Sequence, residues 1–468
     1  MILGVMLAAE IMDMLDATIV NVAGPSLEVS LGATSLGLQR VISGYALALG
    51  AGLILGGRLG DRFGRRRIFL LGLAGFTLAS LLCAMAPSIE LLIAFRLVQG
   101  TAGAILLPQG LGLLRENLSG KELGIAFGIF GPALGLGGIL GPVIGGGLIE
   151  ADLFGLGWRS VFLVNLPVGI AAFAIAWFIL PRRSGDQAIG IDLLGAAIIV
   201  ASSGSLVLAL NLAVEQDWPL WTWLCIAAGL LGFVLFAWQQ QRLTARGGVP
   251  LVVAAIFKKP AYTLGLVGIA LFFSGLIGTQ LVLTLFLQMG NGFSAGEAGL
   301  GNLPIAIGSA VGGAISGAFL AEKIGRPIFH LAAIVQFAGV VLLWFELDHG
   351  TPFSIWSIVP GIFLFGAGGG AVIAALFSSI LAAVDDSEIG SASGVLTAVQ
   401  AIASSIGVAV FGLIFMNSLA GDASPGDAFR QTLFVQAGLL VAFFLVAFWF
   451  PKELRADTHG GAVVMPGV

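Results

Sequence analysis

Three carboxylates lie close together in an otherwise apolar stretch near the start of the chain. Glu10, Asp13 and Asp16 follow one another at intervals of three residues, and Asn21 lies five residues further on. On a helix they occupy one arc, with Glu10 and Asp16 about 9 Å apart along the axis. Acids placed inside a bilayer are expected to face a water-filled cavity. Burial and mutual repulsion favour their neutral form, so this arrangement indicates a group that binds and releases protons.

Arg96 is a basic residue placed deep inside another apolar stretch. A guanidinium in a bilayer needs acceptors, and the acids of 2–24 are its expected partners. One interpretation is a proton-coupling site formed by Asp16, Asp13 and Arg96, with Glu10 as a proton site or as the counter-charge of a cationic substrate. The other is a static set of hydrogen bonds with a structural ion pair, and the sequence leaves both open.

The composition places these charges in a membrane protein. Of 468 residues, 58% are hydrophobic and 10% are charged, and the mean hydropathy is +1.05. A soluble protein carries about 25% charged residues, so a soluble enzyme, a nucleic-acid binder and a disordered chain are excluded. The 70 glycines are typical of closely packed membrane helices. Cys83 and Cys225 lie inside apolar runs, so no disulfide framework is expected.

The chain contains fourteen apolar runs that approach the length of about 20 residues needed to cross a bilayer. A charged segment, 239–260, separates the first eight from the last six. We therefore predict an all-α polytopic membrane protein. The predicted spans are 2–24, 41–57, 68–86, 91–113, 124–149, 160–180, 192–212, 219–238, 263–288, 299–320, 330–347, 353–378, 390–416 and 430–450.

Basic residues accumulate in alternate loops between these spans. If the loop 58–67 is cytoplasmic, as the positive-inside rule indicates, seventeen of the 21 lysines and arginines lie on that side. Acidic residues mark the opposite loops. Both termini are then predicted to be cytoplasmic.

A ten-residue pattern occurs twice in the chain. GGRLGDRFGR at 56–65 and GAFLAEKIGR at 317–326 each follow the second span of a set of six. Two related halves around a central site are typical of secondary transporters. We predict an N-terminal six-helix bundle at 1–184, two inserted transmembrane helices at 185–240, a cytoplasmic linker at 241–262, a C-terminal six-helix bundle at 263–452 and a cytoplasmic tail at 453–468.

Five motifs follow one another along the first part of the chain. They are LDATIVNVA at 15–23, GRLGDRFGRRR at 57–67, RLVQG at 96–100, GGILGPVIGG at 137–146 and WRSVFLVNLP at 158–167. Together they resemble the motifs of the major facilitator superfamily, and within it the fourteen-helix drug:proton antiporters of the EmrB/QacA type. The resemblance implies the major facilitator fold, with two pseudo-symmetric six-helix bundles plus two inserted helices. It also supports the choice of Asp16 as the first candidate for proton coupling.

The motif at 57–67 is predicted to form a latch between helices that breaks when the cytoplasmic gate opens. Its candidate gating residues are Gly57, Asp61, Arg62 and Arg65, and the pattern returns at Glu322, Lys323 and Arg326. A run of basic residues is also a topology signal, which is the alternative interpretation.

Seven glycines lie between 135 and 147, around Pro142. Small residues allow close, sliding contact with a neighbouring helix, and proline removes a backbone hydrogen bond. We predict that Gly137, Gly141, Pro142 and Gly145 form a seal between the two halves, with simple close packing as the alternative.

Polar residues inside the predicted spans are candidates for a substrate site. Each is as good a candidate for a hydrogen bond between helices. The candidates are Glu10, Asn21, Tyr45, Gln99, Asn165, Gln280 and Gln400. With 33 phenylalanines and two tyrosines, we predict a broad apolar cavity suited to lipophilic compounds.

The expected function is proton-coupled efflux of lipophilic, preferentially cationic drugs or antibiotics by alternating access, across a bacterial plasma membrane. A dedicated exporter of one metabolite or lipid is the alternative. The sequence has no nucleophile constellation, metal-ligand spacing or Walker loop, so neither enzyme activity nor a cofactor is expected and the proton gradient supplies the energy. The expected partners are a lipophilic small molecule, protons and the lipid bilayer, without nucleic acid, and the protein is expected to be a monomer.

Overall fold

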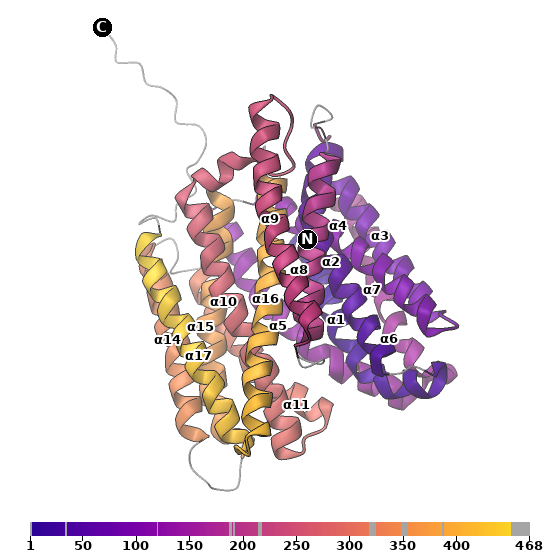
Figure 1. The fold of residues 1–468 in the computed structure, drawn as a ribbon, viewed down its shortest axis with the longest axis vertical. Helices are drawn as coiled ribbons and strands as arrows, with labels where there is room; N and C mark the ends of the chain where they lie inside the picture. The colour runs from indigo at the N-terminus through magenta and orange to yellow at the C-terminus, as the bar shows by residue number, and fades with distance from the viewer. Residues whose placement is uncertain are drawn as a thin grey trace.

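The computed structural model describes residues 2–32, 35–118, 120–186, 190, 192–213, 218–317, 324–347, 354–385 and 388–450. Within these residues the chain consists of helices and the loops between them (Figure 1). The predicted all-α architecture is confirmed.

The helices up to residue 179 pack against one another, and we call them the N-terminal group. Long helices at the start of this group run well beyond the predicted spans, because polar residues continue them at their ends. Its elements are α1 (Ile2–Leu31), α2 (Ser35–Phe63), α3 (Arg65–Ala84), α4 (Ile89–Asn117), α5 (Gly120–Ala151), η1 (Leu153–Gly155), η2 (Gly157–Arg159), α6 (Ser160–Leu163) and α7 (Asn165–Ile179).

A hairpin of α8 (Leu193–Ala213) and α9 (Leu220–Ala245) follows, and then the C-terminal group. This second group also packs on itself (Figure 1). Its elements are η3 (Ala254–Lys258), α10 (Pro260–Leu285), η4 (Phe286–Gly290), α11 (Ala295–Gly301), α12 (Leu303–Ile315), α14 (Pro327–Glu346), α15 (Ile355–Ala382), α16 (Ile389–Ala420), α17 (Pro425–Val446) and η7 (Ala447–Trp449).

Twelve segments of the described chain are long and apolar enough to cross a membrane. Each matches one of the predicted spans. The other two predicted spans, 2–24 and 124–149, correspond to α1 and α5, which are helices of 30 and 32 residues but are not among the twelve. The α1 helix carries three acids, Glu10, Asp13 and Asp16, within seven residues. A multi-pass membrane protein is confirmed, whereas the count of fourteen is not.

Two predicted spans are interrupted. The span 160–180 begins as α6 and continues after Val164 as α7. The span 299–320 covers the end of α11 and all of α12, and Asn302 lies between them. A proline lies at the start of α12, and proline has no N–H to continue the preceding helix.

The two groups meet through glycines that bring backbones into direct contact. A Cβ on Gly57 of α2 would overlap the carbonyl oxygen of Gly390 in α16. A Cβ on Gly313 of α12 would likewise overlap the carbonyl oxygen of Gly128 in α5. Both contacts lie toward the end of the molecule that holds Arg58, Arg65 and Arg115, which we call the arginine-rich end. Here the groups are closed against each other.

The α8–α9 hairpin lies along the boundary between the two groups (Figure 1). Its two helices are held together by Ser205 Oγ, which donates to the carbonyl of Cys225 at 2.8 Å. A Cβ on Gly50 of α2 would contact Val207 Cγ2 of α8 at 3.1 Å. On its other side, α8 packs Leu206 and Leu210 into a cluster with Ala409 of α16. The inserted helices therefore bridge α2 and α16.

The packing of α8 on α2 can be tested with a disulfide. A Cβ at position 50 would lie 3.9 Å from the Cβ of Val207, within the range of about 3.5–4.5 Å found in disulfides. The Gly50→Cys/Val207→Cys variant, in a Cys225→Ala background, should oxidise to a disulfide, measured as loss of both thiols in a maleimide–polyethylene glycol gel shift. Gly438→Cys/Val207→Cys is the control, because Gly438 faces open space. Equal oxidation of both pairs would contradict this packing.

Candidate functional site

The three acids of α1 are buried between the helices of the N-terminal group. The exposed fraction is 6% for Glu10, 1% for Asp13 and 0% for Asp16. The expectation that these acids face a water-filled cavity is therefore wrong for Asp13 and Asp16 in this conformation. Neighbouring side chains donate to both carboxylate oxygens of Asp16 and to one of Asp13.

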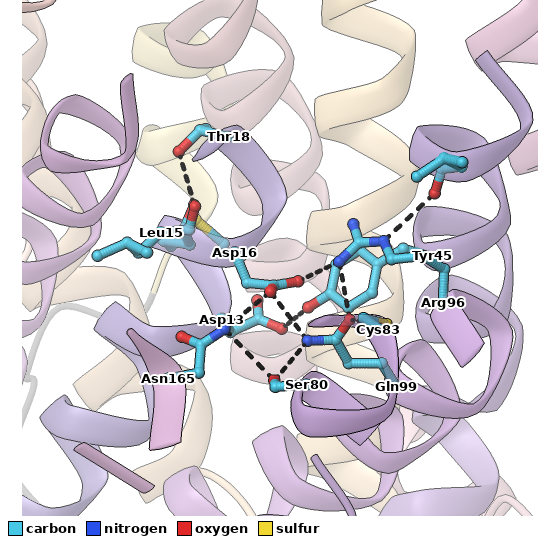
Figure 2. A network of polar contacts seen from close by, with 12 residues as sticks. Asp13, Leu15, Asp16, Thr18, Tyr45, Ser80, Cys83, Arg96, Gln99 and Asn165 are labelled. Carbon is cyan, nitrogen blue, oxygen red and sulfur yellow. Dashed lines mark hydrogen bonds and ion pairs between the residues drawn. The ribbon is translucent and has the colours of Figure 1, made fainter. Parts of the chain in front are cut away.

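Asp16 is the centre of a network that joins four helices (Figure 2). Its Oδ2 accepts from Arg96 Nη1, and this ion pair is completely buried. Its Oδ1 accepts from Gln99 Nε2 at 2.8 Å and from Asn165 Nδ2 at 2.9 Å. The predicted pairing of Arg96 with a carboxylate of the first helix is confirmed. Asp16 therefore has a charged donor on one carboxylate oxygen and two amide donors on the other.

The α4 helix supplies two members of this network from adjacent turns. Arg96 and Gln99 are three residues apart and therefore lie on one face, where Arg96 Nη1 donates to Gln99 Oε1 at 2.9 Å. Gln99 Nε2 also donates to Ser80 Oγ of α3 at 2.8 Å, and Cys83 Sγ lies 3.6 Å from Gln99 Oε1. Ser80 is not predictable from the sequence, since a serine in an apolar helix carries no signal that distinguishes this role.

Asp13 lies in a different environment, beside Tyr45 of α2. Tyr45 Oη donates to Asp13 Oδ1, while the buried Oδ2 has no hydrogen-bond partner among the described residues. The guanidinium of Arg96 lies over the Tyr45 ring, 4.2 Å from its centroid, in a cation–π contact. Arg96 Nε donates to the Val41 carbonyl at 3.3 Å. Tyr45 therefore contacts both Asp13 and the partner of Asp16.

The structure brings together some of the predicted substrate residues and separates others. Tyr45, Gln99 and Asn165 are buried members of the network. Gln280 in α10 and Gln400 in α16 are half-buried and belong to the C-terminal group, outside this network. Asn21 lies in α1, but its side chain is outside the described residues.

The glycine stripe of α5 packs against α1. Cβ atoms on Gly137, Gly141 and Gly145 would meet Met14, Thr18 and Ile19 respectively. In this conformation the stripe therefore closes a contact inside the N-terminal group. The contacts of α5 with the C-terminal group come instead from Gly128, which meets Gly313 of α12, and from Gly124, which meets Gly317 just after α12. The helix is continuous through Pro142, whose side chain is outside the described residues. A gating role of the stripe stays a prediction.

Asp61 is the main polar link across the arginine-rich end. Its Oδ1 accepts from Arg65 Nη2 at 2.7 Å and from the backbone N–H of Gly390 at 3.1 Å. Arg58 Nη1 lies 3.7 Å from Asp61 Oδ2, and Arg65 Nε donates to Glu116 at 2.5 Å. Because Gly390 is in the first turn of α16, a carboxylate here meets the positive end of that helix dipole.

Lys259 forms ion pairs with two acids just before the start of α16. Its Nζ donates to Asp385 at 2.8 Å and to Glu388 at 2.6 Å. Both acids lie within four residues before the start of α16. Burial alone would lower the pKa of Lys259, but these hydrogen bonds outweigh it and the pKa is raised. The lysine therefore stays charged and neutralises two acids that precede α16.

The other residues of the predicted latch are placed apart from Asp61. Arg62 lies over the Phe63 ring at 5.2 Å. Arg326 Nη1 donates to the Phe448 carbonyl at 2.7 Å, and Glu322 and Lys323 are outside the described residues. A further link across the groups, from Arg115 Nε to the Leu381 carbonyl at 3.0 Å, has no counterpart in the predicted latch.

The described residues are helical, with twelve helices long and apolar enough to cross a membrane and a buried acid–arginine network, as in a multi-pass membrane protein. Residues 6–408 match the model of the Major Facilitator Superfamily. The chain therefore belongs to this superfamily, whose members are transporters rather than enzymes.

Several bacterial relatives carry the names of export or resistance proteins. The chain is 42% identical to the "Probable actinorhodin transporter" of Streptomyces coelicolor, over 90% of this chain and 73% of the relative. It is 32% identical to the "Tetracenomycin C resistance and export protein" of Streptomyces glaucescens (90% and 76%). It is 30% identical to the "Multidrug resistance protein Stp" of Mycobacterium tuberculosis (88% and 75%).

The fold also matches a solved structure. The human organic anion transporter MFSD10 superposes with a TM-score of 0.66 at 16% identity, covering 95% of this chain and 98% of the other. At this level of identity the comparison shows the fold alone. It establishes the major facilitator fold for this chain.

The buried pair can be tested with a double-mutant cycle. Asp16→Asn and Arg96→Gln should each lower the free energy of unfolding by about 3–5 kcal/mol, because each leaves one buried charge without its partner. The double variant should lose less than the sum of the two. Reversible unfolding in mixed micelles measures these differences. Strictly additive losses would show that the two side chains are not energetically coupled.

The backbone contact at Gly57 can be tested separately. Gly57→Leu places a side chain against the Gly390 carbonyl, and such overpacking costs about 1–3 kcal/mol. Closure of the arginine-rich end should weaken, so labelling of an Ile54→Cys reporter by a water-soluble maleimide should increase about fivefold or more. Gly438→Leu is the control and should leave labelling unchanged. Unchanged labelling in Gly57→Leu would mean that this contact does not hold the end closed.

Proposed function

We propose that this protein is a proton-coupled antiporter that exports lipophilic, preferentially cationic compounds by alternating access. The observation that carries the proposal is the acid–arginine network buried among α1, α2, α3, α4 and α7. Ionisable residues inside a membrane protein are costly and characteristically mark ion or proton pathways. In this proposal Asp16, Asp13 and Arg96 form the proton-coupling set, and Glu10 contributes to the substrate site.

The architecture proposed for the membrane has fourteen spans. The twelve apolar helices, together with α1 and α5, give this number and correspond to the EmrB/QacA type. The arginine-rich end is then cytoplasmic by the positive-inside rule. Both termini are cytoplasmic in a bacterial plasma membrane, and two six-helix bundles flank the inserted hairpin. The protein functions as a monomer in the bilayer.

Alternating access requires contacts between the groups that close one end and can separate. Two contacts at Gly390 can close and separate in this way. One is the hydrogen bond from the Gly390 N–H to Asp61, and the other is the backbone contact of Gly57 with the Gly390 carbonyl. In the proposed cycle, these contacts close the cytoplasmic end while protons exchange with the opposite side. Protonation and substrate release then allow the contacts to break.

The proton gradient supplies enough energy for this transport. Each proton that moves inward through 100 mV contributes about 2.3 kcal/mol. Because about 1.36 kcal/mol corresponds to a factor of ten, one proton per cycle supports a roughly fifty-fold gradient of a neutral compound. Any pH difference adds to this. A monovalent cation exchanged for one proton moves no net charge, so the pH difference alone drives its export, and no cofactor is needed.

A dedicated exporter of one metabolite is the second candidate. The observation that favours it is the 42% identity to a relative named for actinorhodin. Relatives named for tetracenomycin C and for multidrug resistance favour a wider class of lipophilic compounds. A panel of ethidium, actinorhodin and tetracenomycin C distinguishes the two, since a dedicated exporter transports one of them and a multidrug exporter transports several.

Proton coupling is tested in proteoliposomes that contain the purified protein and a pH gradient. Ethidium should accumulate against its gradient in the acidic lumen, because outward proton flow drives the exchange. Addition of nigericin, which collapses the pH gradient, should abolish accumulation. Liposomes that lack the protein are the control. Accumulation of ethidium or of either antibiotic that does not respond to nigericin would refute proton-driven antiport.

A further inference from the structure

The two buried aspartates of α1 have the same chemistry but different surroundings. Asp16 accepts three hydrogen bonds, one of them from the Arg96 guanidinium. Asp13 accepts one, from the neutral hydroxyl of Tyr45, and its Oδ2 is buried without a partner among the described residues. Adding a proton to Asp16 would leave the Arg96 charge uncompensated, whereas adding one to Asp13 leaves every ion pair intact.

The charges around Asp13 also favour exchange of a proton at this position. On α1 it lies between two other acids, Glu10 one turn before and Asp16 one turn after, and both oppose a negative charge at Asp13. Arg96 on α4 and the Tyr45 hydroxyl on α2 favour the charge. Neighbours of both signs therefore surround Asp13, and no ion pair requires it to stay charged.

Tyr45 connects the two aspartates. Its hydroxyl contacts Asp13, and its ring lies 4.2 Å from the Arg96 guanidinium that holds Asp16. Tyr45 is itself buried and packs edge-to-face on Phe76, with ring centroids 6.4 Å apart. The position of Tyr45 is therefore fixed. Because this side chain contacts both residues, a change in the charge of Asp13 alters the electrostatic environment of Arg96.

We infer that Asp13 is the residue that takes up and releases the transported proton, while Asp16 stays ionised against Arg96. A proton from water adds to the Asp13 carboxylate to give the neutral acid, and the same proton returns to water on the other side of the membrane. Tyr45 is a positioning residue that orients Asp13 and links it to Arg96. This assignment rests on the proposed antiport and divides the roles within its proton-coupling set.

The test separates proton coupling from substrate exchange in proteoliposomes. Ethidium counterflow without a gradient measures exchange, and pyranine in weakly buffered solution measures protons released when ethidium is added. Asp13→Asn should retain counterflow within about twofold but lose proton release at least tenfold, because exchange needs no change in protonation. Glu28→Gln removes an exposed acid of the same helix and should match the wild type in both measurements.

Tyr45→Phe provides an independent readout. Loss of the hydroxyl removes the one hydrogen bond that stabilises the Asp13 carboxylate, so proton release should persist while the pH of half-maximal transport moves to a higher value. A merely structural tyrosine would change the rate without moving this midpoint. Asp13→Glu keeps an acid at the site and should retain proton release, which excludes misfolding as the cause of the Asp13→Asn result.

The outcomes distinguish this inference from the proposed function. Proton release by Asp13→Asn at the wild-type level, or an unmoved pH midpoint in Tyr45→Phe, would overturn the assignment and leave antiport intact. Absence of ethidium-induced proton release in the wild type would overturn the antiport itself.

Discussion

The ion pair between Asp16 and Arg96 is the constraint around which the N-terminal group is arranged. A membrane interior offers no water to either charge, so the protein must supply every partner. The helices α1, α3, α4 and α7 meet at one point, where Gln99 and Asn165 donate to Asp16 and Ser80 accepts from Gln99 (Figure 2). Arg96 Nη2 has no hydrogen-bond partner among the described residues. Separating any of these helices would leave a buried charge incompletely paired, so they are expected to move as one body.

The contact between the two groups contains no ion pair at Asp61 and depends on backbone groups instead. At the arginine-rich end, Asp61 reaches the backbone of Gly390 and glycines bring helix backbones together. Arg58 and Arg65 neutralise the charge of Asp61, and both belong to the same group as Asp61. When the groups separate, Asp61 keeps its ion pairs and loses one backbone hydrogen bond. The polar contact at this end can therefore break without leaving a charge unpaired, which a rigid-body motion of the groups requires.

The class of protein could be predicted from sequence because composition and loop charges report directly on the membrane. The positions of Asp16, Arg96 and Asp61 were also predictable, since charged residues in apolar helices stand out. Partners such as Ser80, Glu116 and Gly390 were not, because their roles depend on how helices pack and their residue types are common. Exposure of the acids was mispredicted for a related reason. The sequence shows that a buried carboxylate needs donors, but not whether water or side chains supply them.

The same limit explains why spacing alone could not rank the three acids of α1. A periodicity of three places Glu10, Asp13 and Asp16 on one arc and treats them alike. Their differences come from α2 and α4, which give Asp13 a tyrosine and Asp16 an arginine. An acid that must cycle between charged and neutral forms cannot also hold a buried arginine, because each protonation would expose that arginine's charge to a medium that cannot solvate it. Two neighbouring aspartates resolve this conflict, since one can compensate the arginine permanently while the other changes its charge.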